Sequence, residues 1–259
     1  MKGKIKTMKN DELLFINRIK DLAKTAYNQN RYTFSNFLTV EEQTIIESQR
    51  SEISYCPYEY FGGHENCERR IIRFGSEETM GYIEDYPITI LLVEPLLDKF
   101  SDDLNHRDYL GSLMNLGINR NVIGDILIKG KKAYVFCLSE TSEYIISELT
   151  RIKHTSVKIT KVNETCDDLK TELEDMEVLV SSPRIDAIVA SICKISRGKS
   201  QDLFKEKKVF VNNKICENNS LALKSGNIIS IRGIGKFIYE GEGGKTRKDR
   251  VYVKLKKYV

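Results

Sequence analysis

The order of apolar segments between residues 88 and 162 constrains the fold of this chain most strongly. Alternating or uninterrupted apolar residues predict strands, whereas apolar residues three to four positions apart predict helices. By these criteria the order is a strand at 88–93, a helix at 104–116, a hairpin at 125–128 and 133–138, a helix at 139–152 and a strand at 156–162. This β-α-β-β-α-β order predicts a split βαβ, ferredoxin-like domain over residues 85–163. RNA-recognition modules share this topology with many unrelated proteins.

Turn and cap residues support these boundaries. Gly117 is placed to end the first helix, and Gly130 lies in the turn of the hairpin. Tyr134 and Phe136 alternate on the second hairpin strand, where RNA-recognition modules carry stacking aromatic side chains. The surrounding sequence matches that motif only loosely. We therefore favour packing in the core for both rings and keep RNA stacking as the alternative.

The preceding 84 residues predict a helical and hairpin region. An amphipathic helix is expected over 11–27, where apolar residues recur with helical spacing. Thr39 and Glu42 form a capping-box pattern at the start of a second helix. Two short strands, 55–63 and 68–74, are expected around a Gly-Gly turn.

Charge is distributed unevenly along the 259 residues, whose formal net charge is +4. Residues 181–259 carry 18 Lys+Arg and 7 Asp+Glu, whereas residues 1–180 carry 23 Lys+Arg and 30 Asp+Glu. A segment this basic is typical of polyanion-binding proteins, although a solubilising surface is the simpler alternative. The acidic stretch 164–180 is expected to be a connector between the central domain and this basic module.

The basic module is expected to be a small α+β domain. A first helix is predicted to start at Ser182-Pro183, and a second at Ser196 to end near Glu206. Strands are expected at 209–211, 228–231 and 236–239. A flexible turn over 241–244 is expected to precede a final strand at 250–258.

Cations at the start of the second helix suggest the chemistry of the module. Arg197 and Lys199 lie in its first turn, where the helix dipole disfavours each cation by roughly 0.3–1 kcal/mol. A phosphate bound at that end would offset the cost. The predicted RNA-binding residues are Arg184, Lys194, Arg197, Lys199, Lys205, Lys207, Lys208, Lys214, Arg232 and Lys236. Arg107 and Arg120 are candidates for a second RNA contact, and any single lysine is equally compatible with a solvated surface.

Several motifs together resemble known families. Arg184-Ile185-Asp186, Ser196-Arg197, Val209-x-Val211-Asn212 and Gly226-Asn227-x-Ile229 resemble the small RNA-binding domain named after ribosomal protein S-four. Lys207 and Asn213 stand where that domain usually carries glycines. His106-Arg107-Asp108-Tyr109-Leu110-Gly111, Gly117-Ile118-x-Arg120, Gly124-Asp125-Ile126, Gly62-Gly63 and Glu68-Arg69 resemble the bacterial YlmH family.

These resemblances imply a function at the ribosome. Members of the YlmH family are implied to bind RNA on the large ribosomal subunit. They are associated with rescue of stalled subunits carrying peptidyl-tRNA and, through gene neighbourhood, with cell division. The S-four-type resemblance implies that Arg184, Arg197 and Lys199 face RNA. The expected partners are therefore ribosomal RNA, transfer RNA or both, together with the large subunit, and we expect a cytoplasmic monomer.

Two rival classes stay open, an RNA-modifying enzyme of the pseudouridine synthase or methyltransferase type and a protein–protein adaptor. A methyltransferase would need a Gly-rich loop after its first strand, where this chain has Glu94-Pro95-Leu96. A synthase should carry its Arg-x-Asp motif outside the basic module, whereas Arg184–Asp186 lies on the first helix of that module. We therefore expect no enzymatic activity, no catalytic residues and no small-molecule substrate.

The cysteine and glycine patterns predict no cofactor. The six cysteines form no Cys-x-x-Cys pair, which favours free thiols in a reducing cytosol. Cys56, His64 and Cys67 lack a fourth metal ligand with a usual zinc spacing. Neither Gly-Lys-Thr/Ser sequence has the earlier glycine of a P-loop. No secretory signal or membrane span is expected, because the longest apolar run has only the length of a strand.

Overall fold

The structure is a computed structural model that describes residues 2–163, 169, 173–212, 214–247 and 249–258. The chain folds into two compact units, Met1–Lys170 and Thr171–Val259. In the described part of the chain, no helix has the length and apolar character required to cross a bilayer.

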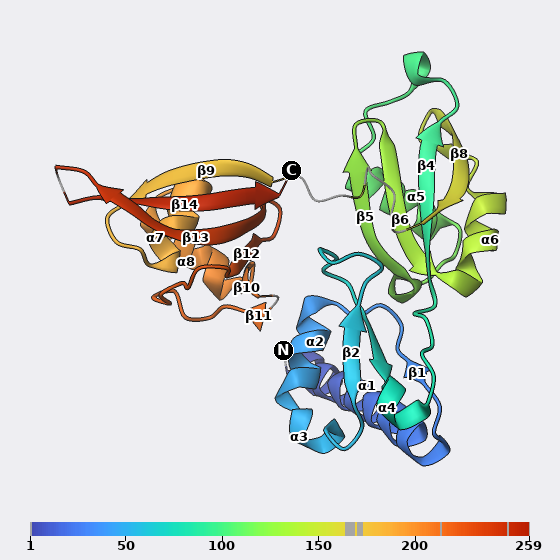
Figure 1. The fold of residues 1–259 in the computed structure, drawn as a ribbon. Coiled ribbons are helices and arrows are strands. Elements are labelled where there is room, and N and C mark those ends of the chain that lie inside the picture. The colour runs from blue at the N-terminus through green and yellow to red at the C-terminus, as the bar shows by residue number, and fades with distance from the viewer. Residues whose placement is uncertain (1, 164–168, 170–172, 213, 248, 259) are drawn as a thin grey trace. The chain divides into compact units, whose positions relative to one another are not determined.

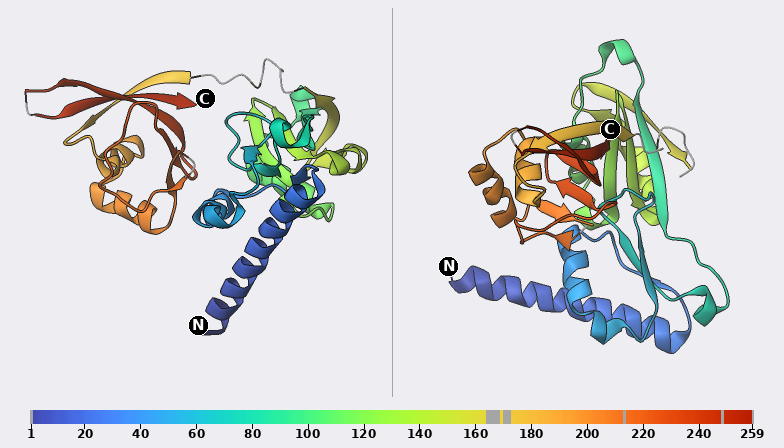
Figure 2. Two further views of the ribbon diagram at one scale, coloured as in Figure 1. Left: turned by 60° about the horizontal axis from the view of Figure 1, so that its bottom comes forward. Right: turned by 60° about the vertical axis from the view of Figure 1, so that its left-hand side comes forward.

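The first part of unit 1 is a small three-stranded sheet packed against a long helix (Figures 1 and 2). Its sheet has the antiparallel order β1-β3-β2. The elements are α1 (Lys2–Gln29), β1 (Thr33–Phe34), α2 (Val40–Ser48), α3 (Arg50–Ile53), β2 (Tyr58–Phe61), β3 (Ile71–Phe74) and α4 (Glu77–Met80). The predicted capping box is confirmed, since Thr39 N–H donates to Glu42 Oε2 at 2.7 Å and Glu42 N–H donates to Thr39 Oγ1 at 3.2 Å.

The second part of unit 1 contains the predicted split βαβ arrangement. Its elements are β4 (Ile88–Pro95), η1 (Asp98–Phe100), α5 (His106–Asn115), η2 (Arg120–Val122), β5 (Ile123–Lys129), β6 (Lys132–Leu138), α6 (Ser139–Glu148), β7 (Arg151–Ile152) and β8 (Thr155–Val162). The sheet order is β5-β6-β4-β8-β7, with the first and third long strands in the centre, as this topology requires. The helix expected over 139–152 ends earlier, at Glu148, because buried Ile152 pairs with Thr155 in a short strand.

The two faces of this sheet bury different sets of side chains. Leu91, Val135 and Cys137 face the core under α5 and α6, whereas Tyr134 and Phe136 point to the opposite face. Both rings are fully buried there, among residues that the N-terminal region contributes. Core packing is therefore confirmed for them, and stacking on RNA from this face is excluded.

A shared core joins regions 1–84 and 85–163, which we expected as separate parts, into one unit. Arg69 donates from Nε to the Ile123 carbonyl at 3.0 Å and from Nη2 to the Phe37 carbonyl at 3.0 Å. The Asp125 carboxylate accepts the main-chain N–H groups of Glu68 and Arg69. Asp125 thus gives hydrogen-bond partners to two main-chain N–H groups of the loop after β2, and the Arg69 side chain joins this loop to the central sheet.

Unit 2 is one six-stranded antiparallel sheet with two helices on a single face (Figure 1). The strand order is β11-β10-β12-β13-β14-β9. The elements are β9 (Leu173–Val180), α7 (Ile185–Ile192), α8 (Arg197–Lys205), β10 (Val209–Val211), β11 (Lys214–Ile215), β12 (Ile228–Ile231), β13 (Gly235–Lys245) and β14 (Val251–Tyr258). Apolar residues of α7 fill the space between helix and sheet, where Ile185, Ile188 and Val189 are fully buried.

Three expectations for this part of the chain were wrong. From residue 173 onward the acidic connector is instead strand β9, because its apolar residues Val178 and Val180 alternate into the core. The first helix starts at Ile185, since the loop before β12 accepts its first N–H groups. The glycine-rich turn at 241–244 lies within β13, where register shifts accommodate it. Residues 164–168 and 170–172 of the expected connector lie outside the described residues. The same holds for Asn213.

Candidate RNA-binding surface

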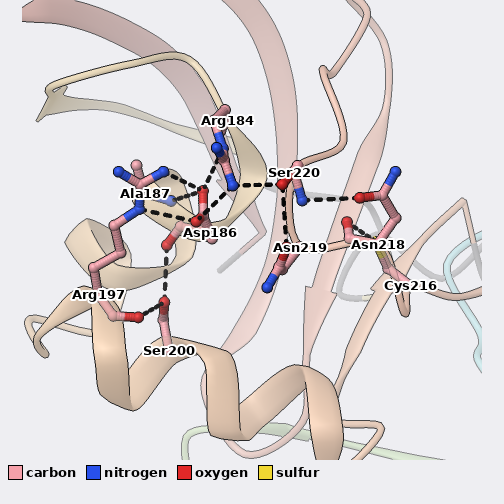
Figure 3. Close-up of polar contacts among 9 residues, drawn as sticks. All are labelled: Arg184, Asp186, Ala187, Arg197, Ser200, Cys216, Asn218, Asn219 and Ser220. Carbon is pink, nitrogen blue, oxygen red and sulfur yellow. Dashed lines mark hydrogen bonds and ion pairs between the residues drawn. The ribbon is translucent and has the colours of Figure 1, made fainter.

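A buried carboxylate holds two of the predicted arginines at the start of α7 and α8. The Asp186 side chain is only 1% exposed, whereas those of Arg184 and Arg197 are 42% and 43% exposed. Arg197 donates from Nε to Asp186 Oδ2 at 2.9 Å and from Nη2 to Oδ1 at 3.2 Å. Arg184 donates from Nη2 to Asp186 Oδ2 at 3.3 Å, from the other side of the carboxylate (Figure 3). We call these three residues the Asp186 cluster.

Neighbouring polar groups fix the position of this cluster. Ser200, on the buried side of α8, donates from Oγ to the Asp186 carbonyl at 3.0 Å and so joins α8 to α7. The Asp186 N–H donates to the Asn219 carbonyl at 3.2 Å. Arg184 Nη2 also donates to Ser220 Oγ, so the loop that carries Asn219 and Ser220 adjoins the cluster (Figure 3).

The charges of the cluster stabilise one another. Burial alone would raise the pKa of Asp186, but the hydrogen bonds and charge of Arg197, with the charge of Arg184, hold that pKa below its ordinary value. In turn, the hydrogen bonds to Asp186 and its charge raise the pKa of Arg197. Asp186 therefore offsets the cost of placing Arg197 in the first turn of α8. From the sequence alone, a bound phosphate was the expected source of that compensation.

Helical geometry separates the two cations at the start of α8. Successive residues of a helix are about 100° apart, so Arg197 and Lys199 project about 200° apart. Arg197, Gln201 and Lys205 share one side of the helix, four residues apart. We call the residues along this side, with Arg184 and Lys207, the α8 strip. The structure does not bring Lys199 into this strip.

A shallow hollow lies along the α8 strip. Its volume is about 190 Å³, and it is lined by Gln201, Phe204, Lys205, Lys207, Glu217 and Asn219. The side-chain amides and Lys205 suit polar or anionic groups, whereas Lys207 lies 3.9 Å from the Glu217 carboxylate. Asn219 lines the hollow and its carbonyl accepts the Asp186 N–H, so the hollow adjoins the Asp186 cluster.

Both helices end at a lysine with left-handed backbone conformation. Lys194 has φ 53° and Lys207 has φ 54°, and each is the first residue after its helix cap. At the end of α8, Lys208 N–H donates to the Leu203 carbonyl at 2.8 Å and Lys207 N–H donates to the Phe204 carbonyl at 3.0 Å. These bonds form a Schellman motif, so Lys207 occupies the position of the usual glycine and the helix ends where the pattern predicted.

The other predicted cations of the module lie at separate places. Lys208 forms an ion pair with Glu206 at 2.6 Å, and exposed Lys214 lies in edge strand β11. The Arg232 guanidinium lies over the Phe210 ring, 5.6 Å from its centroid, and Lys236 lies 5.7 Å from the Tyr258 centroid. These residues do not extend the α8 strip continuously.

Acidic residues of β9 face the basic residues of β14. On the outer face of the sheet, Glu177 pairs in register with Lys254 and Asp175 with Lys256. Lys256 also forms a 2.7 Å ion pair with Glu240. These pairs balance much of the positive charge of β14 on the outer face of the sheet.

The two candidates in unit 1 have different surroundings. Arg107 is exposed in the first turn of α5. Arg120 is partly buried and donates from Nη1 to the main-chain carbonyls of Ile123 and Gly124. Burial, with the nearby charge of Arg69, lowers the pKa of Arg120 to about 10. Arg120 thus holds the start of β5 in place.

Sequence reasoning underestimated Asp186 and did not identify Gln201, Asn219 or Ser220. The spacing of eleven residues between Asp186 and Arg197, across a helix–turn–helix, is compatible with their contact. No local pattern marks the other three, because they adjoin the strip only through the tertiary fold.

Of the described cysteines, Cys193 and Cys216 pack in the core of unit 2, and the others belong to unit 1. Five of them, Cys56, Cys67, Cys137, Cys193 and Cys216, are free thiols, whereas Cys166 lies outside the described residues. Burial raises the pKa of Cys137 to about 12, so this thiol is unreactive in the folded protein. Within the described residues, no three His, Cys, Asp or Glu side chains are grouped to hold a metal ion.

Comparison with known proteins identifies the family. Residues 82–166 match the family described as "Putative RNA-binding domain in YlmH". The chain is 30% identical over 243 residues to the ribosome-associated protein quality control protein P2 of Bacillus subtilis (strain 168), a match that covers 93% of each chain. The structure of the cell division protein ylmH from Streptococcus pneumoniae is similar in fold, with a TM-score of 0.51 and 13% identity over 61% of this chain and 94% of that one. None of these descriptions names an enzymatic reaction. On the extent of its similarity to the Bacillus subtilis protein, the chain belongs to the YlmH family.

Proposed function

We propose that this protein binds RNA at the ribosome and uses the α8 strip to contact the ribose-phosphate backbone. The observation that carries the proposal is the Asp186 cluster, in which two half-exposed guanidiniums are held side by side by one buried carboxylate. Arginine is well suited to phosphate, because its planar donors match phosphate oxygens. Contacts of this kind orient a protein on RNA without reading its sequence.

Two further findings support a ribosomal partner. The Bacillus subtilis relative is named as a ribosome-associated quality control protein, and it matches this chain over 93% of its length. The segment 82–166 matches a family described by RNA binding. We extend the proposal to the large subunit carrying peptidyl-tRNA and to rescue of such subunits, with ribosomal RNA or transfer RNA as the ligand. In this proposal the protein acts as a cytoplasmic monomer without an enzymatic reaction of its own.

Sedimentation with ribosomes tests this proposal directly. The purified protein is mixed with ribosomal subunits in moderate salt and centrifuged through sucrose, with and without prior nuclease treatment. We expect it to sediment with the large subunit and to be released by nuclease or by high salt. Sedimentation that survives complete RNA digestion would indicate a protein adaptor instead, and failure to sediment with any subunit would contradict the proposal.

A further inference from the structure

Asp186 presents an electrostatic conflict if the α8 strip binds RNA. A carboxylate among cations reduces their attraction for a polyanion, and burying it carries a desolvation cost. Yet its side chain is only 1% exposed and accepts hydrogen bonds from two arginines. A residue that opposes the net charge of its own surface needs another role.

The hydrogen bonds occupy Nε and Nη2 of Arg197 and Nη2 of Arg184. Arg197 directs Nε and Nη2 to Asp186, which fixes its planar group by two bonds. Arg184 directs Nη2 to both Asp186 and Ser220. Both side chains stay more than two-fifths exposed, and the Nη1 group of each is not among these donors, so each arginine keeps N–H groups for a ligand.

We infer that Asp186 is the positioning residue of the RNA site: it fixes Arg184 and Arg197 in advance, so that their outer N–H groups bind phosphate oxygens of one RNA backbone segment. This inference rests on the proposed function. Arginine side chains lose rotamer freedom when they bind, and fixing them beforehand removes that entropic cost from the binding step. Asp186 itself does not touch RNA and acts through the two arginines.

A substitution at Asp186 separates positioning from charge, because the two predict opposite signs. Asp186→Asn removes one negative charge with little change in size, and its amide oxygen can still accept the Ala187 N–H at the position used by Asp186 Oδ1. Charge alone predicts tighter RNA binding, by up to about threefold in moderate salt. Positioning predicts binding about tenfold weaker, because both guanidiniums lose a charged partner.

The matched control is Asp202→Asn, an identical substitution on the neighbouring helix α8. The Asp202 side chain is 63% exposed and lies 3.6 Å from Lys205. Its neutralisation should leave binding unchanged or strengthen it. Affinities are measured by filter binding, with bulk transfer RNA and purified ribosomal RNA as separate probes, and folding is checked by circular dichroism. If Asp186→Asn binds as tightly as the unmodified protein, or more tightly, the inference is wrong.

A second variant covers the case in which Asp186→Asn fails to fold. Arg197→Lys keeps the charge but replaces the planar two-point contact by a single ammonium. Positioning predicts a severalfold loss of affinity, and full affinity would overturn it. The double variant Arg184→Ala/Arg197→Ala tests the proposed function separately. If that variant binds RNA normally, the α8 strip is not the RNA site. If it loses binding while Asp186→Asn and Arg197→Lys keep it, only the inference about positioning fails.

Discussion

Gly63 lies so close to Phe136 that a Cβ built on the glycine would be 2.6 Å from Cδ1 of the ring. Its φ of +92° is also one that residues with side chains rarely adopt. Phe136 is fully buried in the central sheet, so a shift of its ring would disturb the surrounding core. The glycine therefore permits close packing between the N-terminal region and the sheet.

Gly63→Ala should destabilise unit 1 by about 2–4 kcal/mol, from overpacking together with the unfavourable φ. Gly81→Ala is the control, since Gly81 has φ +78° but nothing within 4 Å of a built Cβ. It should cost only about 1–2 kcal/mol. Urea unfolding followed by circular dichroism measures both. Equal losses of stability would show that the close approach to Phe136 contributes nothing.

Arg69→Met should also destabilise unit 1, by about 2–4 kcal/mol, because it leaves partly buried carbonyls without a donor. The carbonyls of Phe37 and Arg120 would lose the Arg69 donor, whereas the Ile123 carbonyl would keep its hydrogen bond from Arg120. The same replacement at exposed Arg31 should change stability by less than about 0.5 kcal/mol. The comparison uses thermal unfolding of the full chain, and a similar melting temperature for both variants would contradict the role assigned to Arg69.

Arg197→Ala/Lys199→Ala should weaken RNA binding across sequences and flatten its dependence on salt. Removing one lysine or arginine from a phosphate reduces the steepness of log affinity against log salt by about 0.7–0.9. Since the two residues project on different sides of α8, Arg197→Ala alone should account for most of the decrease in affinity. Filter binding at several salt concentrations measures both quantities. An unchanged slope in the double variant would count against the predicted RNA-binding role of these residues.

Lys207→Gly should stabilise unit 2 by about 0.5–1.5 kcal/mol, because glycine adopts the left-handed conformation of Lys207 without a steric penalty. Lys205→Gly, two residues earlier and still helical, should destabilise it by about 1 kcal/mol. Each variant removes one lysine from the α8 strip, so both should bind RNA more weakly. A Lys207→Gly variant less stable than the unmodified protein would show that its side chain contributes more than the backbone conformation costs.

Asp186 should make the stability of unit 2 depend on pH in the acidic range. Burial opposes its ionisation, but the two arginines outweigh burial and keep the pKa of Asp186 low in the folded chain. The stabilisation is therefore complete above the unfolded value of about 3.9 and is lost as pH falls through the lower folded value. Urea midpoints from pH 7 to pH 2 should show Asp186→Asn less stable than the unmodified protein at pH 7, with the difference shrinking below about pH 4. A difference independent of pH would contradict this linkage.

Local patterns predicted most of the fold. The capping box at Thr39, the end of α5 before Gly117 and the hairpin turn at Gly130 all depend on neighbours in sequence, and all were found as expected. Alternation along β6 predicted that Tyr134 and Phe136 share one face, and the loose match to the RNA-recognition motif favoured their burial. The residues that cover the Phe136 ring could not be predicted, since Phe37, Cys67 and Ile71 of the same core lie far away in the sequence.

The candidate site could be predicted only as a set of cations. The sequence identified Arg184 and Arg197 by type and position, but their partner Asp186 lies on a different helix from Arg197 and meets it only when α7 and α8 pack. The separation of Lys199 from Arg197 follows from helix geometry that a count of charges ignores. Acidic residues of β9 were assigned to a connector because net charge outweighed the alternation of Val178 and Val180.

Strand β9 determines where a fragment of the C-terminal module can begin without losing part of its sheet. A fragment beginning at residue 181, where the charge changes sign, would lack the outermost strand of its own sheet. Val251 and Val253 would be less well covered by apolar side chains, and the backbone of β14 would be left as an open edge able to pair with another molecule. Self-association of such a fragment would then result from truncation rather than from any property of the intact protein.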